Sequence, residues 1–263
     1  MDFVVGHPRS GTQFLSRLLN ACRFGVSEHE LLFALSWDSV WLPSEFYAGR
    51  ADAQLVARLL DAYAQRSPWV QIDCNWKLTW ILPVLLDKFP DARVLHLVRD
   101  PRHAIKSCYD LDYYGVVDEQ PDADQPTLRR NYWLRWMPRV HRDDWESLSR
   151  FERNCAFWAE SQRLCLQALP ALGDRYLRVQ VEALADDAEV ARVAAHFALP
   201  PPTAELLRIL RGVGPINAKP HEKEEAAARG IAPLPEPSAW DAATRDAFDR
   251  SCGPLAQALG YPW

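Results

Sequence analysis

The segment from Asp2 to Asn20 constrains the fold more than any other part of the sequence. Phe3, Val4 and Val5 form a short apolar run, which predicts a buried strand. A short loop from Gly6 to Gln13 follows, and its glycines suit a backbone that turns sharply or approaches a ligand closely. Beyond it, apolar residues recur at helical spacing, so the loop leads into a helix N-terminus. These residues are Phe14, Leu15, Leu18 and Leu19.

The loop Gly6-His7-Pro8-Arg9-Ser10-Gly11-Thr12-Gln13 has the features of an anion site. Backbone N–H groups and the positive dipole end of the helix favour a negative ligand, and Arg9 adds a planar donor fork. Gly6 and Gly11 have Walker A spacing, but Thr12 and Gln13 stand where that motif has Lys and Ser/Thr. We therefore interpret it as a phosphate-cradling loop, and the missing Lys and Ser/Thr argue against the ATP-dependent reactions of Walker A enzymes. A strand-turn-helix unit with a packing role alone is the alternative.

Composition narrows the class of protein. The chain has 263 residues, 48% of them apolar and 25% charged, which is typical of a globular protein and long enough for a sizeable core. The net charge of −5 gives no general case for binding nucleic acid or a membrane surface. No apolar run is long enough for a membrane span, and the chain begins directly in its first strand, without room for a signal peptide.

The cysteines are far apart and form no CxxC pair, so we expect reduced core residues of a cytoplasmic protein and no metal site. They are Cys22, Cys74, Cys108, Cys155, Cys165 and Cys252.

Strand and helix patterns alternate along the chain, which predicts a single α/β domain with an open, doubly wound parallel sheet flanked by helices. Further strands are expected at Val70–Cys74, Arg93–Val98 and Tyr176–Val181. A helix is expected to begin at Pro101, and others at Ala51–Gln65, Leu78–Phe89, Trp145–Leu169, Glu182–Phe197, Thr203–Arg211 and Asp241–Leu259. Because Arg9, Lys77 and Arg99 each follow a predicted strand, we expect all three to face the same crevice, outside the carboxyl ends of the strands.

Two segments lack a regular period. Residues 109–142 are acidic first and basic later, with aromatic residues between, and we expect an ordered, substrate-covering insert; a solvated loop is the alternative. Residues 212–237 are rich in Gly, Pro and charge and are interpreted as a loop or lid.

Arg99 and Ser107 form a second candidate anion site. Arg99 ends a predicted strand, and Ser107 follows about two turns into the next helix, so the two can hold one phosphate from two sides. The alternatives are an Arg99 paired with a carboxylate and a Ser107 satisfied within its helix.

With these two motifs in order, the sequence resembles the sulfotransferases that use 3′-phosphoadenosine 5′-phosphosulfate (PAPS), closest in motif to the tyrosylprotein-sulfotransferase-like and bacterial branches. Residues 8–15 resemble the family's 5′-phosphosulfate loop, and residues 97–102 with Ser107 resemble its 3′-phosphate site. Weaker similarities are residues 180–184 and the C-terminal residues 252–261. The resemblance covers nearly the whole chain and implies a P-loop, nucleotide-kinase-like fold.

The resemblance implies transfer of a sulfuryl group from PAPS, as co-substrate and without a metal, to a hydroxyl or amine of a small-molecule, sugar or lipid acceptor. Arg9, the backbone amides of Ser10, Gly11, Thr12 and Gln13, and the Thr12 hydroxyl would bind the phosphosulfate. Arg99 and Ser107 would hold the 3′-phosphate. A P-loop kinase and a non-catalytic nucleotide-binding protein are the alternatives, and the acceptor and the oligomeric state are left open.

A general base must take the acceptor proton. The resemblance places it on Glu30, with Glu28 and His29 as close rivals, and we expect burial beside Trp37 or Trp41 to raise the Glu30 pKa. It also implies that Lys77 contacts the sulfate, although Trp76 is inserted into the family's Cys-Asn-Lys.

Ser238-Ala239-Trp240 resembles the Ser-Lys-Trp of the tyrosylprotein-sulfotransferase-like branch. The resemblance implies that Ser238 contacts the leaving group and that Lys219 supplies the charge that Ala239 lacks; a surface serine and a surface lysine without a role are the alternative.

Overall fold

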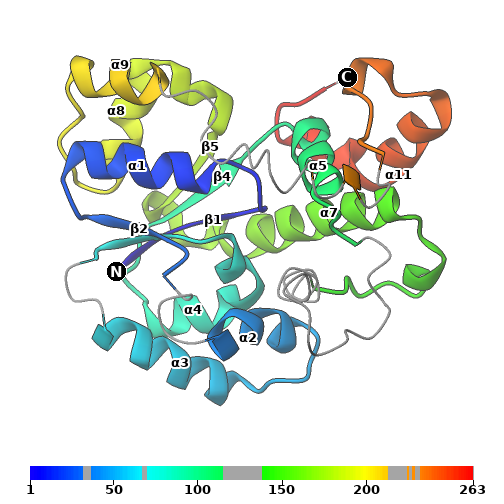
Figure 1. Ribbon diagram of the computed structural model, residues 1–263. Coiled ribbons are helices and arrows are strands. Elements are labelled where there is room, and N and C mark those ends of the chain that lie inside the picture. The colour runs from blue at the N-terminus through cyan, green and yellow to red at the C-terminus, as the bar shows by residue number, and fades with distance from the viewer. Residues whose placement is uncertain are drawn as a thin grey trace. The chain divides into compact units, whose positions relative to one another are not determined.

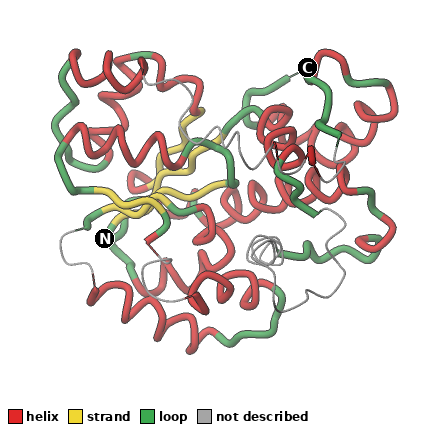
Figure 2. Tube along the Cα trace, viewed as in Figure 1, coloured by secondary structure: helices red, strands yellow, loops and turns green. Residues whose placement is uncertain are grey.

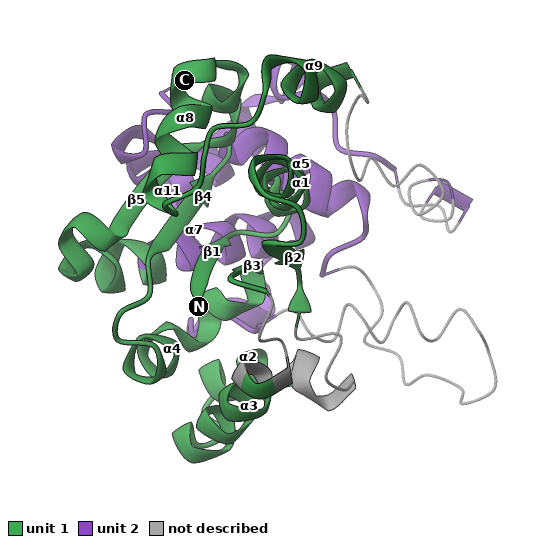
Figure 3. Cartoon of the chain, turned by 90° about the vertical axis from the view of Figure 1, so that its left-hand side faces the viewer, with its two compact units in different colours: residues 1–99, 164–218 green, residues 100–163, 219–263 purple. Residues whose placement is uncertain are grey.

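The computed structural model describes residues 1–31, 37–66, 70–114, 138–212, 224, 227–228 and 232–262 (Figure 1). The chain divides into two compact units. The first consists of residues 1–99 and 164–218, and the second of residues 100–163 and 219–263 (Figure 3).

The first unit contains a parallel five-stranded sheet in the order β2-β3-β1-β4-β5; Figure 2 shows the strands in yellow. Its strands are β1 (Asp2–Gly6), β2 (Ser27–His29), β3 (Ile72–Cys74), β4 (Val94–Val98) and β5 (Tyr176–Gln180). Both neighbours of β1 are later strands, β3 on one side and β4 on the other, so the chain order reverses at β1. The predicted α/β fold with an open parallel sheet is confirmed, and β2 is a strand in addition to those predicted.

Alternating side chains of β1 belong to the two cores that cover the faces of this sheet. Val4 packs with α1 (Thr12–Cys22), α8 (Asp187–His196) and α9 (Ala204–Gly212). Phe3 and Val5 pack with α3 (Ala53–Arg66), with α4 (Leu82–Lys88) and with the end of the long helix α7 (Arg150–Ala168). Figure 1 shows α1, α8 and α9 on one side of the strands and α3 and α4 on the other. This alternation follows from the period of two along a strand.

Several predicted helices have different bounds. The helix expected at Leu78–Phe89 begins as a 3-10 turn, η2 (Trp76–Ile81), because the Asn75 side chain accepts a hydrogen bond from Lys77 N; α4 follows it. The helix expected at Glu182–Phe197 is divided at Asp186 into η5 (Val181–Ala185) and α8, since the Asp186 carboxylate caps α8 through Ala188 N.

Two further elements of the first unit were not predicted. They are α2 (Trp37–Tyr47) and the 3-10 turn η4 (Pro170–Arg175).

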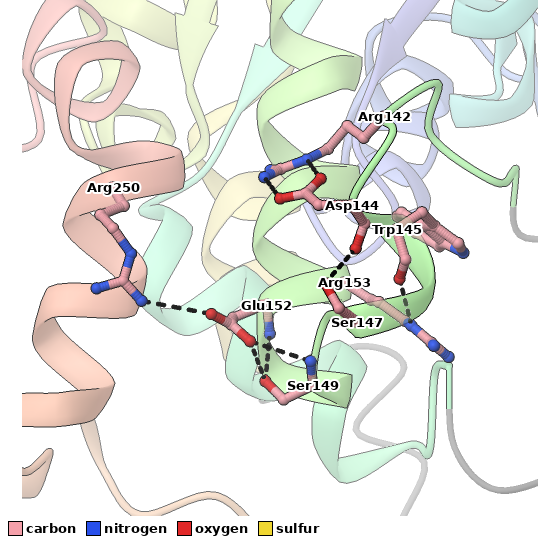
Figure 4. Close-up of polar contacts among 8 residues, drawn as sticks. All are labelled: Arg142, Asp144, Trp145, Ser147, Ser149, Glu152, Arg153 and Arg250. Carbon is pink, nitrogen blue, oxygen red and sulfur yellow. Dashed lines mark hydrogen bonds and ion pairs between the residues drawn. The ribbon is translucent and has the colours of Figure 1, made fainter.

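The second unit contains α5 (Pro101–Asp110), most of α7, and α11 (Ala242–Ala258), with the 3-10 turns η3 (Trp145–Ser147) and η6 (Pro237–Ala239). Ahead of α7, the Ser149 hydroxyl contacts the Glu152 carboxylate at 2.8 Å and accepts from Glu152 N at 3.3 Å, and Ser149 N donates to the same carboxylate (Figure 4). This is a capping box, and it explains why α7 starts at Arg150.

Of the predicted insert at 109–142, residues 115–137 lie outside the described part of the chain. Its two ends are fixed within the second unit. The Tyr114 hydroxyl donates to Pro138 O at 2.8 Å, and the Arg150 guanidinium donates to the buried Asp112 carboxylate at 2.7 Å. Of the predicted lid at 212–237, the described end is bound to α5, because Leu234 N donates to Asp110 and Lys106 donates to Leu234 O.

All six cysteines lie within the described residues; each is a thiol, and five of them are buried, as predicted. In the part of the chain that the structure describes, no helix has the length and apolar character needed to cross a bilayer.

Candidate functional site

The predicted site residues of the first unit follow the carboxyl ends of four adjacent strands. The loop from Gly6 follows β1, Glu30 follows β2, Lys77 comes shortly after β3, and Arg99 follows β4. Since these strands are parallel, all four ends lie at one edge of the sheet.

Gly6 is the last residue of β1, and there is no room for a side chain at this position. A Cβ at this position would lie 2.4 Å from Leu97 O of the neighbouring strand, and its φ is +149°. The Thr79 hydroxyl accepts from Gly6 N at 3.0 Å and donates to Gly6 O at 2.9 Å. The start of the loop is therefore fixed on both sides, and only glycine fits there.

The loop ends at the N-terminus of α1. Gly11 is the N-cap residue, with φ +95°, and therefore offers no side chain to cap the helix; a Cβ there would lie 2.7 Å from Val181 Cγ2. The first residues of α1, Thr12 and Gln13, are uncharged. Arg9 has φ +66°, a conformation that is uncommon for a residue with a side chain. The backbone is thus held in a form that suits a close ligand.

Buried hydrogen-bonding atoms without a partner among the described residues occur in and beside the loop, and two of them belong to a hydroxyl and to an amide N–H₂ group. They are Ser10 Oγ and Asn75 Nδ2, and both residues are completely buried. Both groups are able to donate hydrogen bonds, and an unmade bond of this kind costs about 1–3 kcal/mol. A ligand rich in acceptor oxygens, such as a phosphate or sulfate ester, fits these donors.

Arg99 contacts the loop directly. Its Nη1 donates to the backbone carbonyl of Arg9 at 2.9 Å. The guanidinium of Arg99 therefore reaches the same loop that carries Arg9, which brings two of the predicted anion-binding residues together from positions 90 residues apart.

Glu30 and Lys77 form a largely buried ion pair. Lys77 Nζ lies 3.3 Å from Glu30 Oε2, and the two side chains are 6% and 18% exposed, respectively. The other carboxylate oxygen, Oε1, accepts from Trp76 Nε1 at 2.8 Å. The Lys77 ammonium also lies 4.3 Å from the centroid of the Trp76 ring. Glu30 and Lys77, which the resemblance assigns to catalysis, thus both contact Trp76, to which it assigns no role.

The environment of Glu30 lowers its pKa below the ordinary value of 4.5. Burial raises the pKa, but attraction to Lys77 and His29 and the hydrogen bonds from Lys77 and Trp76 outweigh it. Our expectation of a raised pKa was therefore wrong, because the carboxylate is paired as well as buried. Glu30 is ionised at neutral pH, the form that can accept a proton.

His29 joins β2 to the loop. Its Nε2 lies 3.1 Å from Thr12 Oγ1, so the hydroxyl predicted to contact the phosphosulfate has a neighbour that fixes its direction. His7, inside the loop, is completely buried, and this burial lowers its pKa to about 3 despite an opposing hydrogen bond with the Pro8 backbone. His7 is thus neutral near pH 7. Glu28 is exposed.

The remaining predicted residues lie in the second unit or outside the described part of the chain. Ser107 is half-buried on α5, and Ser238 is exposed on η6; both lie in the second unit, where these two elements contact each other. Their roles stay predictions. Lys219, and the side chains of Trp37 and Trp41, lie outside the described residues.

Sequence reasoning gave no role to Trp76, Thr79 or Asn75. Trp76 was noted only as an insertion that displaces Lys77. Their position in the sequence could have indicated a role, because all three follow a predicted strand at the edge where ligands bind in α/β sheets.

Comparison with solved structures defines the class of fold. The sulfotransferase STF9 from Mycobacterium avium superposes with a TM-score of 0.54 over 98% of this chain and 76% of its own, at 17% identity. The sulfotransferase domain of the olefin synthase from Synechococcus PCC 7002 covers 89% of this chain and 95% of its own, with a TM-score of 0.43 and 16% identity. No family model and no curated protein matches the chain. The chain has the fold of STF9, which confirms the fold prediction.

Proposed function

We propose that this protein is a sulfotransferase that moves a sulfuryl group from PAPS to a hydroxyl or amine of a small-molecule, sugar or lipid acceptor. One observation carries the proposal: the Glu30–Lys77 pair lies at the strand edge that also holds the Gly6–Gln13 loop, which is predicted to bind an anion, and the His29–Thr12 contact links that edge to the loop. The fold of STF9 and the two sequence motifs support the same reaction.

The donor substrate fits the residues around the loop. The backbone N–H groups at the start of α1 and the Ser10 hydroxyl are donors for the phosphosulfate oxygens. Arg9 supplies a positive charge beside them. In the proposal Arg99 binds the 3′-phosphate, together with Ser107 by resemblance alone, and Ser238 and Lys219 assist at the leaving group on the same basis.

The chemistry is an in-line displacement at sulfur. The acceptor oxygen or nitrogen forms a bond to sulfur while the bond between sulfur and the bridging phosphate oxygen breaks, and that electron pair stays on the departing phosphate. Arg9 and the helix N-terminus stabilise the charge that develops there. Glu30 accepts the acceptor proton, and Lys77 offsets the negative charges of the carboxylate and the sulfuryl oxygens.

Kinase chemistry is the less favoured reaction. Thr12 and Gln13 replace the Lys and the Mg²⁺-binding hydroxyl of a Walker A loop, so the groups that hold ATP and its metal in such enzymes are different here.

Two experiments test the proposal. Isothermal titration with 3′,5′-adenosine bisphosphate (PAP), ADP and ATP should show preference for PAP. Incubation with ³⁵S-labelled PAPS and a panel of phenols, sugars and amines should yield a labelled acceptor. Preference for ATP would favour a kinase, and PAP binding without transfer to any acceptor would favour a non-catalytic binding protein.

A conservative variant sharpens the binding experiment. Arg99→Lys keeps the charge but loses the planar donor fork, so PAP affinity should fall by about tenfold or more while ADP affinity changes little. Arg17→Lys, at an exposed position on α1, is the matched control. An equal loss of affinity for PAP and for ADP would show that Arg99 does not bind the 3′-phosphate.

A further inference from the structure

Trp76 contacts both members of the Glu30–Lys77 pair. Its indole N–H donates to Glu30 Oε1 at 2.8 Å, and the Lys77 ammonium, 4.3 Å from its ring centroid, bonds the other carboxylate oxygen. Each carboxylate oxygen thus has its own donor, one on either side. Two donors on two oxygens fix the rotation of a carboxylate about its last bond, which a single donor does not.

The backbone around these side chains is also fixed. Trp76 is the first residue of η2, directly after Asn75, whose side chain caps the turn and whose N–H donates to Val4 O at 2.9 Å. Glu30 has φ +57°, and its N–H donates to Cys74 O at 3.2 Å. The strained conformation of Glu30 turns its side chain out of the line of β2, toward the residues that follow β3.

We propose that Trp76 is a positioning residue of the sulfuryl-transfer site: it orients the Glu30 carboxylate through the indole N–H and supports the Lys77 ammonium through its ring face. The inference rests on the proposed function, in which Glu30 accepts the proton. With one lone pair on each oxygen engaged, the remaining lone pairs face fixed directions, and the incoming proton meets a carboxylate that does not need to reorient. The indole N–H also stabilises the ionised form of Glu30.

The insertion of Trp76 thus has a function in this chain. It displaces Lys77 by one position relative to the motif that the sequence resembles, and the same residue provides the aromatic surface beside which the displaced ammonium reaches Glu30.

Trp76→Phe is the direct test, because it keeps an aromatic ring under Lys77 and removes the N–H. ¹³C NMR titration of the Glu30 carboxyl should give a higher pKa than in the parent protein. The acid limb of the pH profile of kcat should move to higher pH, and kcat should fall by roughly 10- to 100-fold, with PAP affinity close to that of the parent. The matched control is Trp80→Phe, which removes the same N–H from the same 3-10 turn; the ring of Trp80 packs edge-on against Tyr47, with 4.8 Å between the centroids.

A Trp76→Phe variant that titrates and turns over like Trp80→Phe would overturn the positioning role. A second measurement needs no change at Trp76: in the parent protein its indole ¹⁵N–¹H signal should shift as Glu30 titrates, and this pH dependence should vanish in Glu30→Gln. A signal indifferent to Glu30 would also overturn it. The Glu30 pKa shift in Trp76→Phe and the pH-dependent indole signal of the parent protein could both be seen while the parent transfers no label from PAPS. That result would refute the proposed function, and the positioning role with it, but the contact between Trp76 and Glu30 would stand.

Discussion

The buried Glu30–Lys77 ion pair leads to a prediction about the free energy of unfolding that requires no assumption about function. Lys77→Met keeps the approximate volume of the side chain and removes its charge, so Glu30 keeps its burial, the Trp76 hydrogen bond and the attraction to His29 but loses its ion-pair partner. At 3.3 Å the attraction between the two charges is about 5 kcal/mol for an effective dielectric constant of about 20. Part of this offsets the desolvation of both groups, so the expected loss in the free energy of unfolding is about 3–5 kcal/mol at neutral pH.

The sign of the pH dependence follows from the lowered pKa of Glu30. In the parent protein the pair adds stability above the ordinary pKa of a glutamate, and this contribution is lost as the pH falls through the lower, folded-state pKa. In Lys77→Met the Glu30 pKa rises, because the attraction to Lys77, the largest contribution that opposes the effect of burial, is lost while burial remains. The difference between the two proteins should therefore shrink as the pH falls and the variant's Glu30 becomes protonated.

Urea unfolding followed by circular dichroism measures this difference. Lys88→Met is the matched control, since Lys88 pairs with Asp61 at the surface, and its loss should be below about 1 kcal/mol. In the double variant Lys77→Met/Glu30→Gln, most of the Lys77→Met loss should be recovered, because no unpaired charge is left buried. Equal, pH-independent losses for Lys77→Met and Lys88→Met would refute the reasoning.

Two further predictions concern stability. Gly6→Ala places a Cβ 2.4 Å from Leu97 O at a positive φ, so it should cost about 2–4 kcal/mol, whereas Gly49→Ala, with open space around the position, should cost only the conformational strain. Thermal unfolding compares the two, and equal shifts in Tm would contradict the steric argument. Ser149→Ala removes the cap of α7 and should cost about 1 kcal/mol in chemical unfolding, more than Ser147→Ala; a smaller loss than this control would count against the capping box.

The sequence predicted the first unit well where local pattern and tertiary packing agree. The apolar run ending at Val5, the glycine loop and the helix after it are a local signal, and so is the buried run at Val94–Val98. Placing Arg9, Lys77 and Arg99 at one edge needed only the rule that parallel strands end together.

The parts that could not be predicted depend on contacts between distant residues. The 3-10 turn at Trp76 forms because the Asn75 side chain caps it, and the Glu30 carboxylate meets an indole 46 residues further along the chain. No spacing rule gives such a contact. The predicted direction of the Glu30 pKa shift was wrong for the same reason. The direction depends on which residue pairs with the carboxylate, and that residue is Lys77.

The positive φ of Arg9 and of Glu30 is another feature without a sequence signal. Pattern rules assign this conformation to Gly and Asn, and a charged residue adopts it only where surrounding contacts hold the backbone. Both residues are in the candidate site. Local preference was therefore least informative at the positions that the proposal uses most.

The rate of sulfuryl transfer by Glu30→Gln tests the central claim most directly. With ³⁵S-labelled PAPS and an acceptor found in the panel, Glu30→Gln should lower kcat by about 10²- to 10⁴-fold and still bind PAP, whereas Glu28→Gln, two residues away on the exposed side of β2, should retain the parent rate. An unchanged kcat in Glu30→Gln would contradict the account and remove the carboxylate paired with Lys77 from the reaction.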